Sequence, residues 1–214
     1  MNIIKQQKMK KSELSIILSK LNVFEKPNAK QEQYPTDSEN ASFILWNAFM
    51  QGDIENKTLA DFGCGTGILG LGALLLGAKH CFFIDNDKKA IEIAEQNLLL
   101  LEKETKNELC SKATFLVMDI KMFNEKVDVI IENPPFGTKQ EHADMIFLDK
   151  ALQLGKRIYS MHKTSTLEFL RKYLSTKGKI TNEYNLSMPL KSTMPFHKKR
   201  IERIDVTCLR IEII

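Results

Sequence analysis

The sequence is poor in residues that bind metals or form cross-links. Its 214 residues include four cysteines and four histidines, and the cysteines are widely separated, with no Cys-x-x-Cys pair among them. This spacing argues against a zinc site and against a disulfide framework, so we predict reduced thiols and no bound metal. No stretch approaches the roughly 18 consecutive apolar residues of a membrane-spanning helix, and the first residues lack the apolar run and cleavage site of a secretory signal. We therefore expect a cytoplasmic protein.

The hydrophobic content is sufficient for a single core. Hydrophobic residues make up 43% of the chain and charged residues 27%, as in a globular domain. Residues 1–30 contain seven lysines against two glutamates, and we predict that they form a basic, helical N-terminal extension. Residues 31–214 are predicted to form one domain, because the sequence shows no internal repeat, low-complexity segment or second apolar core.

Periodic apolar residues predict alternating strands and helices. Helical spacing occurs over 10–21, 37–51, 67–76, 87–103, 143–154 and 165–175, and extended segments occur over 58–63, 81–85, 113–119, 127–133, 157–162, 179–188 and 200–214. Apolar strands separated by helices are typical of a mainly parallel sheet with helices on both faces. We predict an α/β, Rossmann-like fold with seven strands. The last two strands have no helix between them and should form an antiparallel hairpin.

A glycine-rich turn follows the first predicted strand. Residues 61–70 read DFGCGTGILG, and glycines at Gly63, Gly65 and Gly67 allow a sharp backbone turn and the close approach of a ligand. Gly65, Gly67 and Gly70 also match the dinucleotide pattern Gly-x-Gly-x-x-Gly. The glycines alone therefore leave open a nicotinamide cofactor, another nucleoside cofactor or a purely structural turn.

Carboxylates end the second and third predicted strands. Asp85 lies 20 residues after Gly65, where a carboxylate can accept hydrogen bonds from both hydroxyls of a ribose. Asp119 ends the third strand and is placed to accept from an adenine amino group. Asp85, Asn86 and Asp87 could instead cap the helix that follows. The joint occurrence of the glycine loop and the two acids favours a nucleoside site.

Residues 133–136 read NPPF where the fourth predicted strand ends. The expected sheet order places this end beside that of the first strand, in the crevice where ligands bind. The Asn133 amide oxygen and the Pro134 carbonyl can accept both hydrogens of an exocyclic amine, Pro135 stiffens the turn, and Phe136 offers a face to a planar ring. Such an amine needs positioning more than a strong base. The electrophile that fits is the methyl group of S-adenosylmethionine, although an isolated NPPF would also fit an ordinary turn.

Five motifs in order carry a resemblance to a known family. DFGCGTG followed by IIENPPFGTK resembles the class I methyltransferases that modify amino nitrogens. Together with EQYPT (32–36), YSMHK (159–163) and FHKK (196–199), these motifs resemble the methyltransferase-like protein five family. The resemblance implies a class I methyltransferase domain over 31–214 that uses S-adenosylmethionine to place N6-methyladenosine on small-subunit ribosomal RNA.

The resemblance also implies roles for individual residues. The target base would be held by the catalytic residues Asn133, Pro134, Pro135 and Phe136. The cofactor would contact Gln33, Tyr34, Thr36, Asp61, Gly63, Cys64, Gly65, Gly67, Asp85, Asn86, Asp119, Ile120 and Asn133. RNA would contact His162, Lys163, His197, Lys198, Lys199 and Arg200, although packing roles suit lone histidines equally well. A small zinc-binding methyltransferase activator protein would pair with an exposed edge strand at 113–118 and cover Phe115 and Val117.

The charge distribution agrees with a polyanionic partner. Residues 150–203 hold thirteen Lys or Arg and three Glu, which suggests RNA, although a solvated lysine-rich surface would have the same composition. Three other functions stay open: a protein glutamine methyltransferase, whose substrate also presents a planar NH2 group, a guanine-N2 RNA methyltransferase, and a non-catalytic RNA-binding module on the same fold. The intact glycines, Asp85 and the NPPF sequence argue against the last.

Overall fold

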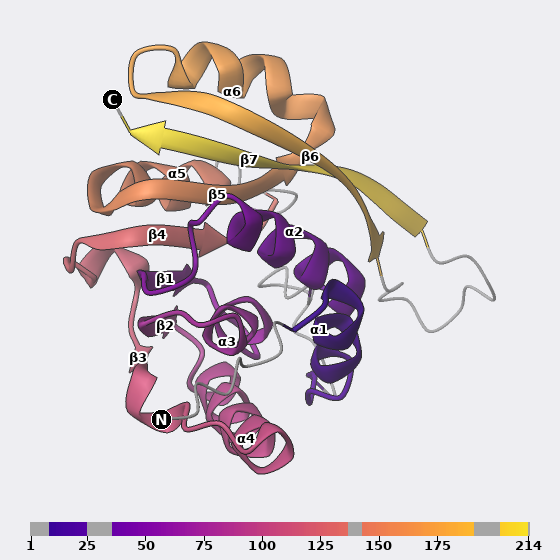
Figure 1. The fold of residues 1–214 in the computed structure, drawn as a ribbon. Helices are drawn as coiled ribbons and strands as arrows, with labels where there is room; N and C mark the ends of the chain where they lie inside the picture. Colours follow the sequence, from indigo (N-terminus) through magenta and orange to yellow (C-terminus); the bar gives the residue numbers. More distant parts are fainter. Residues whose placement is uncertain (1–8, 25–35, 137–142, 191–201, 214) are drawn as a thin grey trace, which may run out of the picture.

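Seven strands form one sheet through the middle of the molecule (Figure 1). The structure is a computed structural model that describes residues 9–24, 36–136, 143–190 and 202–213. The strand order is β3-β2-β1-β4-β5-β7-β6. The strands are β1 (Thr58–Phe62), β2 (His80–Asp85), β3 (Ala113–Val117), β4 (Val127–Glu132), β5 (Gly155–Lys163), β6 (Gly178–Leu190) and β7 (Glu202–Ile213). Neighbours among β1 to β5 pair in parallel, whereas β7 is antiparallel to both β5 and β6. The predicted α/β fold with a C-terminal antiparallel pair is confirmed.

Helices cover both faces of the sheet. α2 (Ser38–Met50), α3 (Ile68–Leu75) and α4 (Lys88–Thr105) lie on one face, and α5 (Ala143–Leu154) and α6 (Leu167–Leu174) lie on the other. Along β4, Val129 and Ile131 pack in the first core, whereas Ile130 packs in the second, as the alternation of side chains along a strand requires. None of the helices in the described ranges is long and apolar enough to cross a membrane.

The first helix of the chain contributes to the first of these cores. α1 (Lys11–Leu18) contacts α2 and α3, and its Leu14 and Leu18 are buried among the side chains that cover the sheet. The helix predicted over 10–21 is therefore confirmed. Residues 9–24 share a core with the sheet, while the domain boundary at residue 30 stays a prediction.

The order in which strands are added to the sheet reverses between β1 and β4, although the two strands are parallel. β2 and β3 follow β1 toward one edge of the sheet, and β4 and β5 extend from β1 toward the other edge. In this register Phe62, the last residue of β1, is opposite Glu132, the last residue of β4. The glycine loop and the NPPF sequence therefore begin side by side. In open α/β sheets this switch point, at the carboxyl ends of the strands, is where ligands bind.

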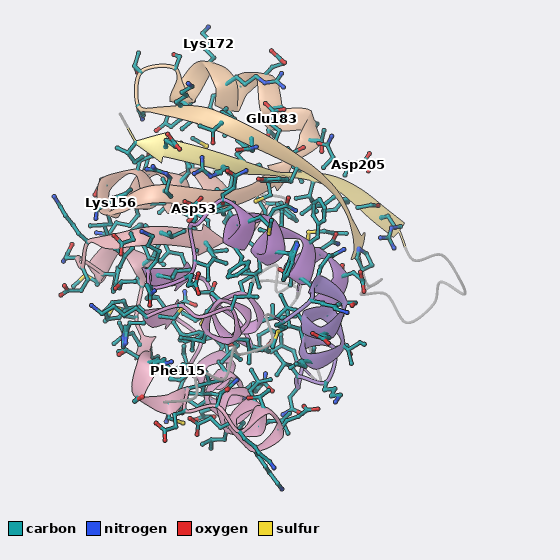
Figure 2. The ribbon with its side chains drawn as sticks, viewed as in Figure 1. Asp53, Phe115, Lys156, Lys172, Glu183 and Asp205 are labelled. Atoms are coloured by element: carbon teal, nitrogen blue, oxygen red, sulfur yellow. The ribbon has the colours of Figure 1, made fainter. Side chains whose placement is uncertain are left out.

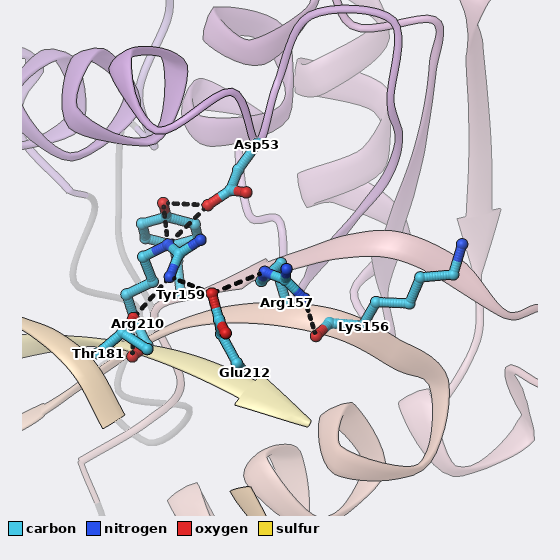
Figure 3. A network of polar contacts seen from close by, with 7 residues as sticks. All are labelled: Asp53, Lys156, Arg157, Tyr159, Thr181, Arg210 and Glu212. Carbon is cyan, nitrogen blue, oxygen red and sulfur yellow. Dashed lines mark hydrogen bonds and ion pairs between the residues drawn. The ribbon is translucent and has the colours of Figure 1, made fainter. Parts of the chain in front are cut away.

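A buried ion pair joins the loop before β1 to the antiparallel part of the sheet (Figure 3). The Asp53 carboxylate accepts a hydrogen bond from Arg210 Nε on β7 at 2.7 Å and another from the Tyr159 hydroxyl on β5 at 2.7 Å. Arg210 also donates to Thr181 Oγ1 at 2.6 Å and to Glu212 Oε1 at 2.8 Å. Burial and the adjacent Asp53 raise the pKa of the Tyr159 hydroxyl, which keeps it protonated as a donor. The network ties β5, β6 and β7 to the loop before β1.

We expect Asp53→Ala to lower the free energy of unfolding by about 3 kcal/mol, because it removes the buried carboxylate that accepts from both Arg210 Nε and the Tyr159 hydroxyl and leaves Arg210 with only the partly exposed Glu212 as a carboxylate partner. Urea unfolding at neutral pH measures this loss. Glu92→Ala is the control, since it removes only an exposed pair with Lys88 on α4 and should change stability by at most about 0.5 kcal/mol. Equal losses in the two variants would contradict the importance assigned to the buried pair.

Candidate functional site

The glycine loop between β1 and α3 adopts backbone conformations that favour glycine. Gly63, Gly65 and Gly67 have φ values of 63°, 53° and 87°. A Cβ atom on Gly67 would also lie 3.1 Å from the Ala94 Cβ on α4. The Cys64 N–H donates to the Ile84 carbonyl at 3.0 Å, which joins the loop to the end of β2. The sharp turn predicted from the sequence is therefore present, and it lies at the switch point of the sheet.

A buried carboxylate, Asp61, and a half-buried one, Asp85, hold this loop in place. Asp61 Oδ2 accepts from the Gly70 N–H at 2.8 Å, and Asp85 Oδ2 accepts from the Gly65 N–H at 2.9 Å. Burial raises the pKa of Asp61 to about 7, against the opposing effect of the Gly70 hydrogen bond, and the charge of Asp85 raises it further. Burial also raises the pKa of Asp85. Both carboxyl groups thus accept hydrogen bonds from the backbone of the loop, and Asp85 is the more exposed of the two.

Residues 85–87 do more than cap the helix that follows them. Asp87 caps α4, since its side chain accepts from the Lys89 N–H at 2.9 Å. Asp85 accepts from the Asp87 N–H with one oxygen and from the Gly65 N–H with the other. Asn86 is exposed between them. Asp85 therefore orients the glycine loop, and its position at the end of β2 is the one expected of a ribose-binding carboxylate.

The predicted adenine side of the site lies at the end of β3. The Met118 N–H donates to the Asp85 carbonyl at 2.9 Å, so the ends of β2 and β3 are adjacent. Asp119 is exposed, and it caps the short 3-10 helix Ile120–Met122 by accepting from the Lys121 N–H at 2.9 Å. Ile120 is buried in the second core. Asp119 thus lies beside Asp85 with exposed surface, as a contact to a base requires.

Asn133 links the end of β4 to the start of α2. Its Nδ2 donates to Thr36 Oγ1 at 2.9 Å, across 97 positions of sequence. Its Oδ1 is buried and has no hydrogen-bond partner among the described residues. A buried amide oxygen without a partner is costly, so this acceptor is available to a donor that enters the site. Gln33 and Tyr34 lie outside the described residues, so their predicted contacts with the cofactor stay predictions.

The rest of the NPPF turn is largely buried. Pro134 is buried, and Phe136 packs with the first core. Gly63 of the neighbouring loop is equally confined, because a Cβ atom there would lie 3.0 Å from the Phe147 ring on α5. The turn and the glycine loop are thus held by packing on both sides, which favours a rigid site.

One contributor to the site was missed by the sequence analysis. Asn97 on α4 is buried, and its side chain accepts from the Asn22 N–H at 2.8 Å and donates to the Asn22 carbonyl at 3.0 Å and the Thr66 carbonyl at 2.9 Å. The Phe24 ring lies 3.7 Å from where a Gly65 Cβ would be. The segment after α1 therefore forms a wall beside the glycine loop. An amide within the apolar face of α4 was the signal that could have predicted this contact.

The predicted RNA contact at His162 is wrong for this structure. Its side chain has 0% exposure, and Nε2 lies 2.8 Å from Ser160 Oγ while Nδ1 lies 3.0 Å from Asp144 Oδ2. The ring is enclosed because β7 pairs with β5 on one side and α5 covers the strand ends. Lys163 is half-buried at the end of β5. His197, Lys198, Lys199 and Arg200 lie outside the described residues and stay predictions.

β3 is the edge strand of the sheet, as predicted. Figure 2 shows Phe115 at this edge. Its ring stacks on Phe83 with centroids 4.5 Å apart and packs partly against the first core, whereas Val117 is 50% exposed. Among the residues predicted to be covered by a partner, Val117 therefore has the larger exposed fraction.

The chain is similar to known methyltransferases in sequence and in fold. The sequence model of the ribosomal protein L11 methyltransferase (PrmA) family matches residues 46–134. The chain is 35% identical to the rRNA N(6)-adenosine-methyltransferase METTL5 of Danio rerio, over 94% of this chain and 98% of that protein. It is 34% identical to Mettl5 of Drosophila melanogaster, over 96% and 98%. The crystal structure of PH1948 from Pyrococcus horikoshii is 38% identical, with a TM-score of 0.85 over 96% of this chain and 98% of that one.

These matches differ in the part of the fold that they cover. The L11 methyltransferase model ends at residue 134, at the NPPF turn, and so covers the cofactor half of the sheet. The METTL5 relatives extend through α5, α6 and the antiparallel strands. The similarity to the METTL5 relatives therefore includes the part of the chain in which the basic residues are concentrated.

We expect Asn97→Ala to weaken cofactor binding and to lower the free energy of unfolding by about 1–3 kcal/mol, because it leaves backbone groups of the glycine loop and the segment after α1 without partners. Calorimetric titration with S-adenosylmethionine and urea unfolding measure the two effects. Asn47→Ala is the matched control, since that amide only donates to the Phe43 carbonyl within α2. An unchanged cofactor affinity in Asn97→Ala would mean that the wall beside the loop does not contribute to the site.

Proposed function

This chain belongs to the family of the rRNA N6-adenosine-methyltransferases, and we propose that it transfers a methyl group from S-adenosylmethionine to the N6 amine of an adenosine in ribosomal RNA. We propose further that the substrate is small-subunit ribosomal RNA. The observation that carries the proposal is the unpartnered Oδ1 of Asn133, at the strand end next to the glycine loop.

The residues of the glycine loop fit the cofactor. The positive φ values at Gly63, Gly65 and Gly67 keep side chains away from the crevice, and Asp85 is fixed at the end of β2 to accept from ribose hydroxyls. Asp119 would accept from the adenine amino group at the end of β3. When bound, S-adenosylmethionine supplies a methyl carbon made electrophilic by its positively charged sulfur.

The NPPF turn fits the acceptor amine. Asn133 Oδ1 accepts one amino hydrogen and the Pro134 carbonyl accepts the other, which turns the nitrogen lone pair out of conjugation with the ring and toward the cofactor site. Phe136, which packs in the first core, would bound the acceptor site on its apolar side. As the nitrogen forms its new bond to carbon it becomes positively charged and acidic, so the surplus proton leaves after transfer and no strong base is needed.

The target adenosine must leave any base stack to reach this position. Extruding a paired base costs a few kcal/mol, so a single-stranded or helix-end adenosine is the expected substrate. The basic residues of the segment 150–203 would attract the RNA. Lys198 and Lys199 within that segment stay candidates for phosphate contacts on the basis of the sequence.

A protein glutamine substrate is the second candidate, because the L11 methyltransferase model matches the cofactor half of the chain and a side-chain amide presents a similar planar NH2 group. The experiment that separates the candidates uses purified protein, S-adenosylmethionine with an isotope-labelled methyl group, and ribosomes as substrate. Digestion to nucleosides and amino acids locates the label. We expect N6-methyladenosine from small-subunit RNA; label in N2-methylguanosine or in a ribosomal protein would contradict the proposal.

Two further parts of the proposal concern partners and location. The exposed edge of β3 would pair with a small zinc-binding methyltransferase activator protein, with Val117 at the contact. Co-purification of such a protein with the chain, lost in a Val117→Lys variant, would support this pairing. A cytoplasmic location stays the expectation of the sequence.

We expect Asn133→Ala to abolish methyl transfer, with a loss of at least about a hundredfold, while the affinity for S-adenosylmethionine falls by less than about threefold. In the proposed site the amide oxygen accepts from the substrate amine rather than from the cofactor, which is why the two quantities separate. Single-turnover kinetics and calorimetry measure them. Asn124→Ala, which alters an exposed loop amide that donates to the Met122 carbonyl and accepts from Lys150 Nζ, is the control. Full activity in Asn133→Ala would remove this residue from the catalytic site.

A further inference from the structure

A buried polar chain runs beneath the NPPF turn. Glu132, the last residue of β4, pairs in register with Ser160 of β5, so their side chains lie on the same face of the sheet. Ser160 Oγ lies 2.6 Å from Glu132 Oε1 and 2.8 Å from His162 Nε2. His162 Nδ1 lies 3.0 Å from Asp144 Oδ2, in the first turn of α5. Four side chains from three elements are thus joined in a single line.

This line of four side chains is buried except at Asp144. Glu132, Ser160 and His162 have 0% exposure, and the Asp144 side chain has 17%. The β1 residue opposite Glu132 is the apolar Phe62. The titratable groups that face Glu132 are His162 on β5, Asp144 on α5 and the Cys208 thiol on β7. Within the described residues Glu132 Oε2 has no hydrogen-bond partner. No Lys or Arg among these groups balances the charge of an ionised Glu132.

The contacts along this line of side chains determine how many hydrogens its polar atoms share. Burial acts to raise the pKa of Asp144, but the hydrogen bond from His162 lowers it overall, so Asp144 is a carboxylate and Nδ1 of His162 carries a hydrogen. Ser160 has one hydroxyl hydrogen, yet it lies between two groups that can each accept, Glu132 and Nε2 of His162. All three contacts form only when one further proton resides on Glu132 or on Nε2.

Two arrangements meet this condition. In the first, the Glu132 carboxyl group donates to Ser160 Oγ and the Ser160 hydroxyl donates to His162 Nε2. In the second, Nε2 of a protonated His162 donates to Ser160 Oγ and the hydroxyl donates to the Glu132 carboxylate. The two differ by the shift of two protons along the line, and their net charge is the same. The first leaves Oε2 as the oxygen of a neutral acid, so its lack of a partner costs less there.

Resting on the proposed function, we propose that Glu132, Ser160, His162 and Asp144 form a one-proton network that positions the Asn133–Phe136 turn for methyl transfer, and that the turn is correctly placed only while this proton is present. Glu132 directly precedes Asn133, and Asp144 lies at the start of the helix that follows the turn. The network thus fixes the chain on both sides of the turn to β5. These are positioning residues, because they act on the substrate through Asn133.

Loss of the shared proton at high pH breaks the network. Burial raises the pKa of Glu132 to about 8, against the opposing hydrogen bond from Ser160, and the charge of Asp144 raises it further. Above that pH the single Ser160 hydrogen bonds to the ionised Glu132 carboxylate, which is a stronger acceptor than a neutral imidazole nitrogen, so the contact with Nε2 of His162 is lost. Because this carboxyl pKa is raised above its ordinary value of 4.5, the contribution of Glu132 to folding is fully present at acid pH and is lost as pH rises toward about 8.

The test compares the pH dependence of transfer in the intact protein and in Glu132→Gln. The glutamine amide donates to Ser160 Oγ as the neutral acid does and cannot lose this hydrogen. We expect the intact protein to lose about tenfold in single-turnover rate between about pH 7 and about pH 9, since about one molecule in ten keeps the proton one unit above the pKa. Glu132→Gln should stay within about threefold of the intact protein at pH 7 and show no such loss. Glu168→Gln, on the exposed face of α6, should keep the profile of the intact protein.

A second measurement does not depend on activity. In protein labelled with 15N in its four histidines, the Nε2 signal of His162 should shift between about pH 7 and about pH 9 in the intact protein and stay constant in Glu132→Gln. A constant signal in the intact protein, or the same alkaline loss of rate in both proteins, would overturn the network. If the protein methylates no RNA at any pH while the Nε2 signal shifts as expected, the proposed substrate is wrong and the network stands.

Discussion

The structure depends on the parallel pairing of β1 with β4. In that register the last residues of the two strands, Phe62 and Glu132, are opposite each other, so the glycine loop and the NPPF turn start from adjacent points. The strands are all parallel here, but β2 and β3 are added toward one edge of the sheet and β5 toward the other, and a switch of this kind leaves an opening at the carboxyl ends of the strands. A donor held by one loop and an acceptor held by the other would meet there without any movement of the sheet.

The cost of this arrangement is that polar groups are buried at the strand ends. Asp61 and Glu132 end or nearly end their strands in apolar surroundings, and burial raises the pKa of both carboxyl groups well above the ordinary range. The two are stabilised differently. Asp61 accepts from the Gly70 backbone and so shapes the cofactor loop, whereas Glu132 depends on the side chains of β5 and α5. The two halves of the site are therefore held by separate polar contacts on opposite faces of the sheet.

The features of the site that depend on neighbouring residues could be predicted from the sequence. Glycines with positive φ, an acid at a strand end and an amide followed by two prolines act through their immediate neighbours, so their spacing is informative. The alternation of strands and helices predicted a mainly parallel sheet, and the order expected for such sheets placed the ends of the first and fourth strands side by side. Contacts between distant segments were not visible in this way: Asn133 donates to Thr36, and Asn97 joins the segment after α1 to the glycine loop.

His162 shows why contacts that depend on the register of the sheet could not be predicted. A histidine next to a lysine in a basic region fits an RNA surface, and only the pairing of β7 with β5 and the position of α5 decide that its ring is enclosed. Glu132 was visible as a charged residue at the end of an apolar strand. Its role follows from Ser160, 28 positions later, and therefore from the register of the sheet.

The most direct test is a crystal structure of the protein with S-adenosylhomocysteine and an adenosine-containing oligonucleotide. We expect the adenine N6 to lie about 3 Å from both Asn133 Oδ1 and the Pro134 carbonyl oxygen, with the cofactor sulfur on the side of the glycine loop. An adenine bound elsewhere, or Asn133 turned away from the bound base, would contradict this expectation.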